Sequence, residues 1–349
     1  MHMADALLSP AVGGAVWALS AGAIACCSAR VRREQDDRQA PLMGVLGAFL
    51  FAAQMINFTV PGTGSSGHLA GGLLLAILLG PAAAFLTVAS VLLVQALFFA
   101  DGGLLALGCN IFNLGLIPAL VVFPLVYRRF IGARPGRFRQ WGVTMTASLV
   151  AMQLGAFAVV LQTAASGVSS LPFSKFLLLM QPIHLAIGLV EGGVTVAVVS
   201  FVRQARPELL QQALGIPAVA TRSRPFFLAA FVAFALFTAG CLSWFASERP
   251  DGLEWSIAKA TGEAELKGGQ RGVHGALAAL QQKSARFRDY RLDAAQGFDS
   301  PDPTGVAKGA AAKGGGLPGL VGTVLTLLLV LFAAMLLKKG SRAAAAPGA

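Results

Sequence analysis

Residues 68–126 read HLAGGLLLAILLGPAAAFLTVASVLLVQALFFADGGLLALGCNIFNLGLIPALVVFPLV and are apolar throughout. This run is too long for one membrane crossing, because a helix needs about 20 residues to cross the hydrocarbon core. Its only helix breakers are Gly80-Pro81 and Asp101-Gly102-Gly103. The breakers predict three crossings, the first short enough to be partly re-entrant: 68–79, 81–100 and 104–126.

The rest of the chain has the same character. Its 349 residues are 56% hydrophobic and only 12% charged, with a mean hydropathy of +0.70, which indicates an integral membrane protein rather than a soluble one. Six further apolar runs are long enough to cross a bilayer. They lie at 10–29, 40–60, 142–163, 173–202, 226–246 and 317–337. We therefore expect an all-α integral membrane protein with about nine transmembrane helices.

The net charge of +11 by itself suggests nucleic acid as a partner, but the distribution of the charge argues against it. Most of the 27 Lys and Arg residues lie in four short stretches beside apolar runs, at 30–39, 127–141, 203–225 and 338–342. This is the positive-inside pattern of a multi-pass membrane protein. It favours the lipid bilayer over nucleic acid as the partner. It also predicts that Met1 lies outside and the C-terminus inside.

The helices and loops predict two modules. Residues 1–202 contain seven predicted helices, and a proline-containing cytoplasmic linker follows at 203–225. A two-helix module occupies 226–337 around a polar loop, 247–316, that the helix count places outside. Residues 338–349 are predicted to form a cytoplasmic tail.

The dipeptide Met1-His2 is a candidate metal chelator. We expect this terminus to stay uncleaved, because the first basic residue is Arg30 and a secretory signal needs an earlier positive charge. The α-amine, together with the amide and imidazole of His2, can close fused chelate rings around one metal ion. Such a planar nitrogen set suits Ni(II) or Cu(II), and Co(II) less well.

His68 is the candidate fourth donor. It follows a glycine-rich loop, 61–67, that the topology places outside with Met1. The terminus can therefore fold back and meet His68, completing a planar four-nitrogen site. Glycines in the loop allow backbones to approach closely. The alternative is that His68 is an interfacial residue that solvates a helix end.

Polar residues inside the apolar runs allow two interpretations. His184 and Glu191 are seven residues apart, hence on one face of a helix, and could line a transport pathway. We favour inward-facing structural hydrogen bonds. Asp101, Asn110 and Asn113 could line a polar interior, and we favour a role in satisfying the backbone of broken helices.

A stripe of small residues, Gly44, Ala48 and Ala52, allows close helix contact. It serves either a partner subunit or packing inside the bundle. His274, in the polar loop, is expected to be exposed. The loop 61–67 has P-loop-like glycine spacing but lacks the Lys and the Ser or Thr that bind phosphate, so ATP use by this chain is not indicated.

Six stretches, taken together, resemble the CbiM/NikM family, the substrate-capture component of nickel/cobalt energy-coupling-factor transporters. They begin at Met1-His2, Gln54, Ser66, Phe99, Leu107 and His184. The resemblance implies that Met1, His2 and His68 hold the metal.

Further roles are also implied by the resemblance. Asn57 would steady the loop formed by Ser65, Ser66 and Gly67, and the stripe at 44–52 would dock on a coupling subunit.

The resemblance also implies a mode of transport. Ni(II) or Co(II) would be the transported substrate, with no cofactor and no enzymatic activity in this chain. A transmembrane coupling subunit and a pair of cytosolic ATPase subunits would supply the energy, in the cytoplasmic membrane of a prokaryote. A cobalt-specific uptake protein for cobalamin synthesis is the alternative cargo assignment.

The polar loop adds a second resemblance. The pentapeptide Pro250-Asp251-Gly252-Leu253-Glu254 resembles the signature of the small accessory subunit of these transporters, here fused to the first module. The alternative is an ordinary Pro-Asp-Gly turn.

Two other classes of membrane protein would have left their own patterns in the sequence. A self-sufficient secondary transporter or channel would need paired intramembrane charges and inverted repeats. An intramembrane metalloenzyme would need a His-Glu-x-x-His-like motif. Neither pattern is present in the sequence.

Overall fold

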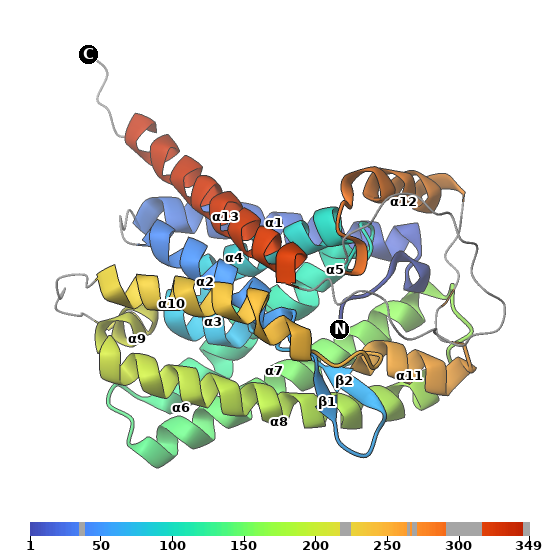
Figure 1. Ribbon diagram of the computed structural model, residues 1–349, viewed down its shortest axis with the longest axis horizontal. Coiled ribbons are helices and arrows are strands. Elements are labelled where there is room, and N and C mark those ends of the chain that lie inside the picture. Colours follow the sequence, from blue (N-terminus) through green and yellow to red (C-terminus); the bar gives the residue numbers. More distant parts are fainter. Residues whose placement is uncertain (35–38, 217–224, 264–265, 267–270, 291–315, 345–349) are drawn as a thin grey trace.

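The computed structural model describes residues 1–34, 39–216, 225–263, 266, 271–290 and 316–344. Helices account for most of this chain (Figure 1). Those of the first module are α1 (Pro10–Glu34), α2 (Gln39–Gln54), α3 (Gly72–Leu79), α4 (Pro81–Val94, continued by a π-type turn, Gln95–Phe99), α5 (Leu107–Ile111, continued by π-type turns, Phe112–Arg128), α6 (Arg129–Ile131), α7 (Arg137–Ser166) and α8 (Phe173–Ala205). They are followed by α9 (Pro207–Ala213), α10 (Pro225–Gly240), α11 (Gly252–Thr261), α12 (Gly272–Ser284) and α13 (Gly316–Ala344).

The expectation of an all-α membrane protein is confirmed. In the described part of the chain, six helices are long and apolar enough to cross a bilayer, and two shorter apolar helices accompany them. The six lie at Pro10–Glu34, Pro81–Phe99, Leu107–Ile131, Arg137–Ser166, Phe173–Ala205 and Gly316–Leu337. The chain is a multi-pass membrane protein.

The predicted crossing at 68–79 is helical only over Gly72–Leu79. α3 has eight residues, about 12 Å of helix at 1.5 Å per residue, which is too short to cross the membrane alone. Residues 68–71 before it are non-helical, and Gly71 has a left-handed backbone (φ +71°). A side chain at Gly71 would also meet Leu50, because its Cβ would lie 2.1 Å from Leu50 Cδ1. Glycine thus permits an irregular entry into the core of the bundle.

The predicted helix at 40–60 is too long. α2 ends at Gln54, because Phe58–Val60 (β1) pairs in antiparallel register with Ser65–Gly67 (β2). This hairpin projects from the bundle and contacts the accessory loop, since the Trp255 indole donates to the carbonyl of Thr63 at 2.9 Å.

The two ends of the bundle differ. Figure 1 shows α11 and α12 at one end and α6 and α9 at the other, with the N-terminus and the hairpin in the half nearer α11. The chain that leaves α3 reaches the second end, where Gly80 lies beside Ala213 of α9. The irregular segment and α3 together therefore connect the hairpin to the end of the bundle at which α9 lies.

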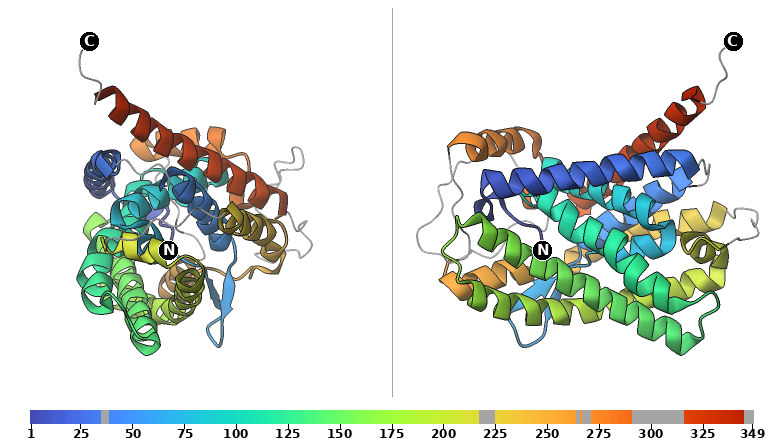
Figure 2. Two further views of the ribbon diagram at one scale, coloured as in Figure 1. Left: turned by 90° about the vertical axis from the view of Figure 1, so that its left-hand side faces the viewer. Right: turned by 180° about the vertical axis from the view of Figure 1, so that it is seen from behind.

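The accessory helices pack directly on the first module. α10 and α13 both contact α2, and Figure 2 shows α13 crossing the bundle obliquely. The small-residue stripe is covered inside the chain: a Cβ on Gly44 would lie 2.6 Å from Leu331 of α13, and Ala48 and Ala52 are buried. As a docking face for a partner subunit it is therefore not accessible in this conformation.

Two predicted boundaries also shift. α8 continues to Ala205, beyond the predicted end at 202, and stops where Pro207 begins α9. The linker 203–225 thus starts as helix, while its residues 217–224 lie outside the described part. The predicted tail, 338–349, begins as helix because α13 extends to Ala344.

Candidate metal site

The first eight residues are drawn into the bundle by hydrogen bonds to their backbone. Asn110 accepts from Met3 N at 2.8 Å and donates to Met3 O at 3.3 Å. Gly103 N also donates to Met3 O, at 3.0 Å. The Asp5 carboxylate accepts from Ala106 N at 2.9 Å. Met3, like Leu7 and Leu8, is fully buried, so the segment is anchored by both polar and apolar contacts.

The segment delivers the Met1 amine to His68. The amine nitrogen lies 3.5 Å from His68 Nε2. His68 Nδ1 lies 3.1 Å from the carbonyl oxygen of Leu69, which can only accept, so Nδ1 carries the proton. Nε2 therefore presents its lone pair to the amine, as a metal ligand would. Neighbouring donors of a planar site with metal–nitrogen bonds of about 2.0–2.1 Å lie about 2.9 Å apart. These two nitrogens are thus close to bonding geometry.

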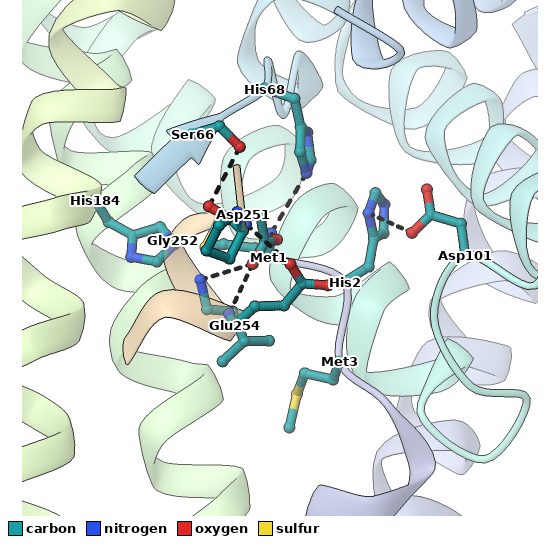
Figure 3. A network of polar contacts seen from close by, with 12 residues as sticks. Met1, His2, Met3, Ser66, His68, Asp101, His184, Asp251, Gly252 and Glu254 are labelled. Atoms are coloured by element: carbon teal, nitrogen blue, oxygen red, sulfur yellow. Dashed lines mark hydrogen bonds and ion pairs between the residues drawn. The ribbon is translucent and has the colours of Figure 1, made fainter. Parts of the chain in front are cut away.

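The side chain of His2 points elsewhere (Figure 3). Its Nδ1 lies 3.1 Å from Asp101 Oδ1, and its ring stacks on that of His68 with centroids 5.1 Å apart. Chelation together with the His2 amide requires Nδ1, because only this ring nitrogen can close a small ring with the backbone. The predicted planar set is therefore not assembled in this conformation, and a turn of the His2 ring would be needed to complete it.

Asp251 also contacts the amine. Its Oδ2 accepts from Met1 N at 2.9 Å, and both groups are largely buried. Its Oδ1 accepts from the backbone N–H groups of Leu253 and Glu254, which begin α11. Residues 250–254, the PDGLE signature, thus form the start of helix α11 at the site rather than a simple turn.

The two acidic side chains at the site are held ionised. Burial alone would raise the pKa of Asp101, but the neighbouring His2 and the hydroxyl of Tyr290, which donates to Asp101 Oδ2 at 2.7 Å, hold it below the ordinary value. Burial would likewise raise the pKa of Asp251, and the positive N-terminal amine holds it below the ordinary value. Both carboxylates therefore supply negative charge beside the candidate ligands.

A small cavity adjoins the amine. It is about 10 Å³, the room that one water molecule needs. Its lining includes Met1, His68, Asp251 and His184. His184 Nδ1 lies 2.8 Å from the carbonyl of Met180, which leaves Nε2 unprotonated, and this buried nitrogen has no hydrogen-bond partner within the described residues. His184 therefore shares the cavity of the candidate site.

The other intramembrane candidates have structural contacts. Glu191 accepts from the backbone N–H groups of Ala70 and Gly71, each at 3.0 Å. It thus provides hydrogen-bond acceptors for the non-helical backbone before α3. Asn113 exchanges two hydrogen bonds with Gln162. Asn110, described above, binds the N-terminal backbone rather than a broken helix.

The predicted loop residues lie beside the site. Ser65, Ser66 and Gly67 form β2, and Ser66 donates its hydroxyl to the carbonyl of Arg249 at 2.7 Å. The Asn57 carbonyl accepts from Ser247 N at 2.7 Å. Its side-chain Oδ1 is buried and has no partner in the residues that the structure describes.

Three contacts were not foreseen from the sequence. Asp251 was expected only as part of a signature, and Tyr290 was not singled out. His274 was expected to be exposed but is half-buried, with Nε2 2.9 Å from the carbonyl of Leu8. All three lie on the accessory loop and contact the first module, and only the PDGLE signature gave a signal for one of them.

Side chains alone do not form a metal site here. Within the described ranges, no group of three or more His, Cys, Asp and Glu side chains is arranged to hold a metal ion.

Two family models match this chain. Residues 2–209 match the family model CbiM, described as a cobalt uptake substrate-specific transmembrane region. The chain belongs to the CbiM family. Residues 226–339 match a PDGLE domain, so the predicted resemblance to a fused protein is confirmed. The family is one of metal transporters rather than of enzymes.

Individual relatives carry nickel and cobalt names. A cobalt transport protein CbiM of Sorangium cellulosum is 34% identical over 61% of this chain and 95% of its own length. A fused nickel transport protein NikMN of Rhodobacter capsulatus is 31% identical over 60% of this chain and 64% of its own. A crystal structure of a transition metal transporter is 27% identical, with a TM-score of 0.53 over 60% of this chain and 95% of that one.

Proposed function

We propose that this chain captures Ni(II) from outside the cell and delivers it inward, with Co(II) as the alternative cargo. The observation that carries the proposal is the buried Met1 amine, 3.5 Å from the bare Nε2 of His68 beside a cavity of one-water size. Once the ammonium has lost its proton, both nitrogens are donors of the kind that late first-row divalent metals prefer.

The proposed bound state adds His2. A turn of its ring about the Cβ–Cγ bond would release Nδ1 from Asp101 and let it chelate together with the backbone amide. The result is a planar set of four nitrogens from Met1, His2 and His68. Planarity favours nickel, whereas the family description and the cobalt relative support Co(II). Asn57 and the loop residues Ser65–Gly67 would close the site.

The energy would come from other subunits. The family model describes a substrate-specific region, which supports a component that works with a membrane coupling subunit and a pair of cytosolic ATPases. We assign metal capture to residues 1–202 and an assisting role to 226–337, joined by the cytoplasmic linker 203–225.

A self-sufficient secondary transporter is the less favoured alternative. It would need a charged pathway, but the carboxylate of Glu191 is occupied by two backbone N–H groups. Uptake assays in cells with and without the ATPase subunits would decide the matter, because metal uptake by this chain alone would overturn the dependence on partners.

The binding site is tested by calorimetric titration of Ni(II) and Co(II) into the purified chain. We expect tight binding of about one ion per chain. We also expect its loss in His68→Ala and in a version with two residues added before Met1. A matched control adds the same two residues after Ala349. If the N-terminally extended version binds like the native chain, the amine is not a ligand.

A further inference from the structure

The accessory loop enters the candidate metal site through the carboxylate of Asp251. One oxygen accepts from the Met1 amine at 2.9 Å, although the two residues are 250 positions apart (Figure 3). The other oxygen accepts from Leu253 N at 2.9 Å and Glu254 N at 2.8 Å. The same carboxylate therefore joins the N-terminus of α11 to the N-terminus of the chain.

The position of this carboxylate is fixed from three sides. Glu254 accepts from Asp251 N at 3.0 Å, which completes a capping box. Ser66 N donates to the carbonyl of Pro250 at 2.8 Å, so the segment extends the hairpin. At Gly252 a Cβ would lie 3.0 Å from Ile187 and 3.1 Å from His184, which leaves little room for a side chain.

The burial of the Met1–Asp251 ion pair indicates a role for the Asp251 carboxylate. The side chains of Met1 and Asp251, whose charged groups form this pair, retain only 5% and 17% of their exposure. A carboxylate this buried is costly unless a positive group stays beside it. A divalent ion on the amine nitrogen would bring more positive charge to that place than the ammonium does, and would attract the carboxylate more strongly.

We propose that Asp251 is part of the metal site, where it supplies the compensating negative charge for the bound ion. The accessory loop then contributes directly to affinity instead of only covering the site. This inference rests on the proposed function, since it requires that the amine bind metal. It also explains the order of the signature: Asp251 faces the amine, Gly252 permits the approach, and Glu254 secures the turn.

A purely structural role for Asp251 predicts a different outcome. Asparagine and serine cap helices about as well as aspartate, so Asp251→Asn and Asp251→Ser keep the cap and remove the charge. Glu254→Gln is the matched control, because glutamine completes a capping box as glutamate does and the Glu254 side chain bonds Asp251 N rather than the amine.

The experiment titrates Ni(II) into the full-length chain and its variants, and compares the thermal unfolding of the metal-free proteins. We expect both Asp251 variants to bind Ni(II) about 10-fold or more weakly, within the range for groups that support metal ligands. Glu254→Gln should stay within about threefold of wild type. Unfolding temperatures of the metal-free Asp251 variants should match that of Glu254→Gln.

Three results would overturn the inference. These are unchanged or tighter binding in the Asp251 variants, equal weakening in Glu254→Gln, and weakening that simply follows a lower unfolding temperature. His68→Ala separates this from a failure of the proposed function. If wild type binds Ni(II) and His68→Ala does not, the site stands and the Asp251 variants test the inference alone. If wild type does not bind, the proposed function itself has failed.

Discussion

Met1 and His2 are neighbours in the chain, yet the structure holds them in different ways. The Met1 amine is paired with a carboxylate of the accessory loop and already faces the lone pair of His68. The His2 ring is turned towards Asp101 of the first module, which Tyr290 of the accessory loop holds in turn. His2 Nε2 is buried with no hydrogen-bond partner in the described part of the chain.

The Met1 amine is thus already near its proposed binding position, whereas the His2 ring is not. Closing the planar site requires little movement of Met1 and a ring rotation of His2. Metal capture should therefore depend on the N-terminal segment being held firmly while one side chain remains free to turn. The following predictions break or sharpen this comparison.

The largest effect is expected from His2→Ala. Removing the imidazole takes away one nitrogen donor and opens the chelate, so Ni(II) affinity should fall by more than about 100-fold, which corresponds to about 2.8 kcal/mol or more. Calorimetric titration measures this directly. His274→Ala is the control, because it also removes a histidine that contacts the N-terminal segment, at Leu8, and should change affinity by less than about threefold. Similar affinities in wild type and His2→Ala would mean that His2 never leaves Asp101.

An intermediate effect is expected from Asn110→Ala. The change removes the two hydrogen bonds between Asn110 and the Met3 backbone, while the bond from Gly103 N and every proposed ligand stay in place. We expect about a 10-fold loss of Ni(II) affinity, since each hydrogen bond contributes about 0.5–1.5 kcal/mol. Amide hydrogen exchange at Met3, followed by mass spectrometry of the N-terminal peptide, should become faster.

Asn113→Ala provides the comparison for Asn110→Ala. Asn113 is equally buried but exchanges its amide hydrogen bonds with Gln162, and it touches Met3 only through sulfur. Its loss should leave exchange at Met3 nearly unchanged. If both variants accelerate exchange equally, general loosening of the bundle rather than the backbone clamp controls the N-terminus.

The smallest effect is expected from Tyr290→Phe. Once His2 has turned, the Tyr290 hydroxyl is the donor that stays on Asp101, so its loss should weaken Ni(II) binding about threefold. The phenyl ring preserves the stacking on Phe99, whose centroid lies 4.8 Å away. In an Asp101→Ala background the same change should have no further effect. An undiminished effect in that background would show that Tyr290 acts through packing instead.

The composition and length of the apolar runs were sufficient to predict the helical spans but not their interruptions. The run 81–100 is one apolar stretch with Pro81 at its start, and it forms the expected helix. The runs 40–60 and 68–79 are equally apolar, yet long-range contacts reshape them: β1 pairs with β2, and Glu191 of α8 caps the segment before α3. An apolar sequence does not reveal which backbone groups a distant residue will satisfy.

The site was predictable where the chemistry is local. A histidine next to an amine is a chelator by covalent structure alone, and the glycine-rich loop identified His68; the structure brings the Met1 amine and His68 together. That all these residues act as ligands stays a prediction. The contacts of Asp251, Tyr290 and His274 depend on how the accessory loop folds over the first module, and no short-range pattern encodes that.

The pairing of Met1 with Asp251 also has a consequence for the order in which the protein is made. Chains are synthesised and begin to fold from the N-terminus, so Met1 is made long before its carboxylate partner, which is 250 positions away. During most of translation the amine and His68 can meet without Asp251. The charge balance of the pocket is thus completed late, when the last-made module closes over the first-made residues.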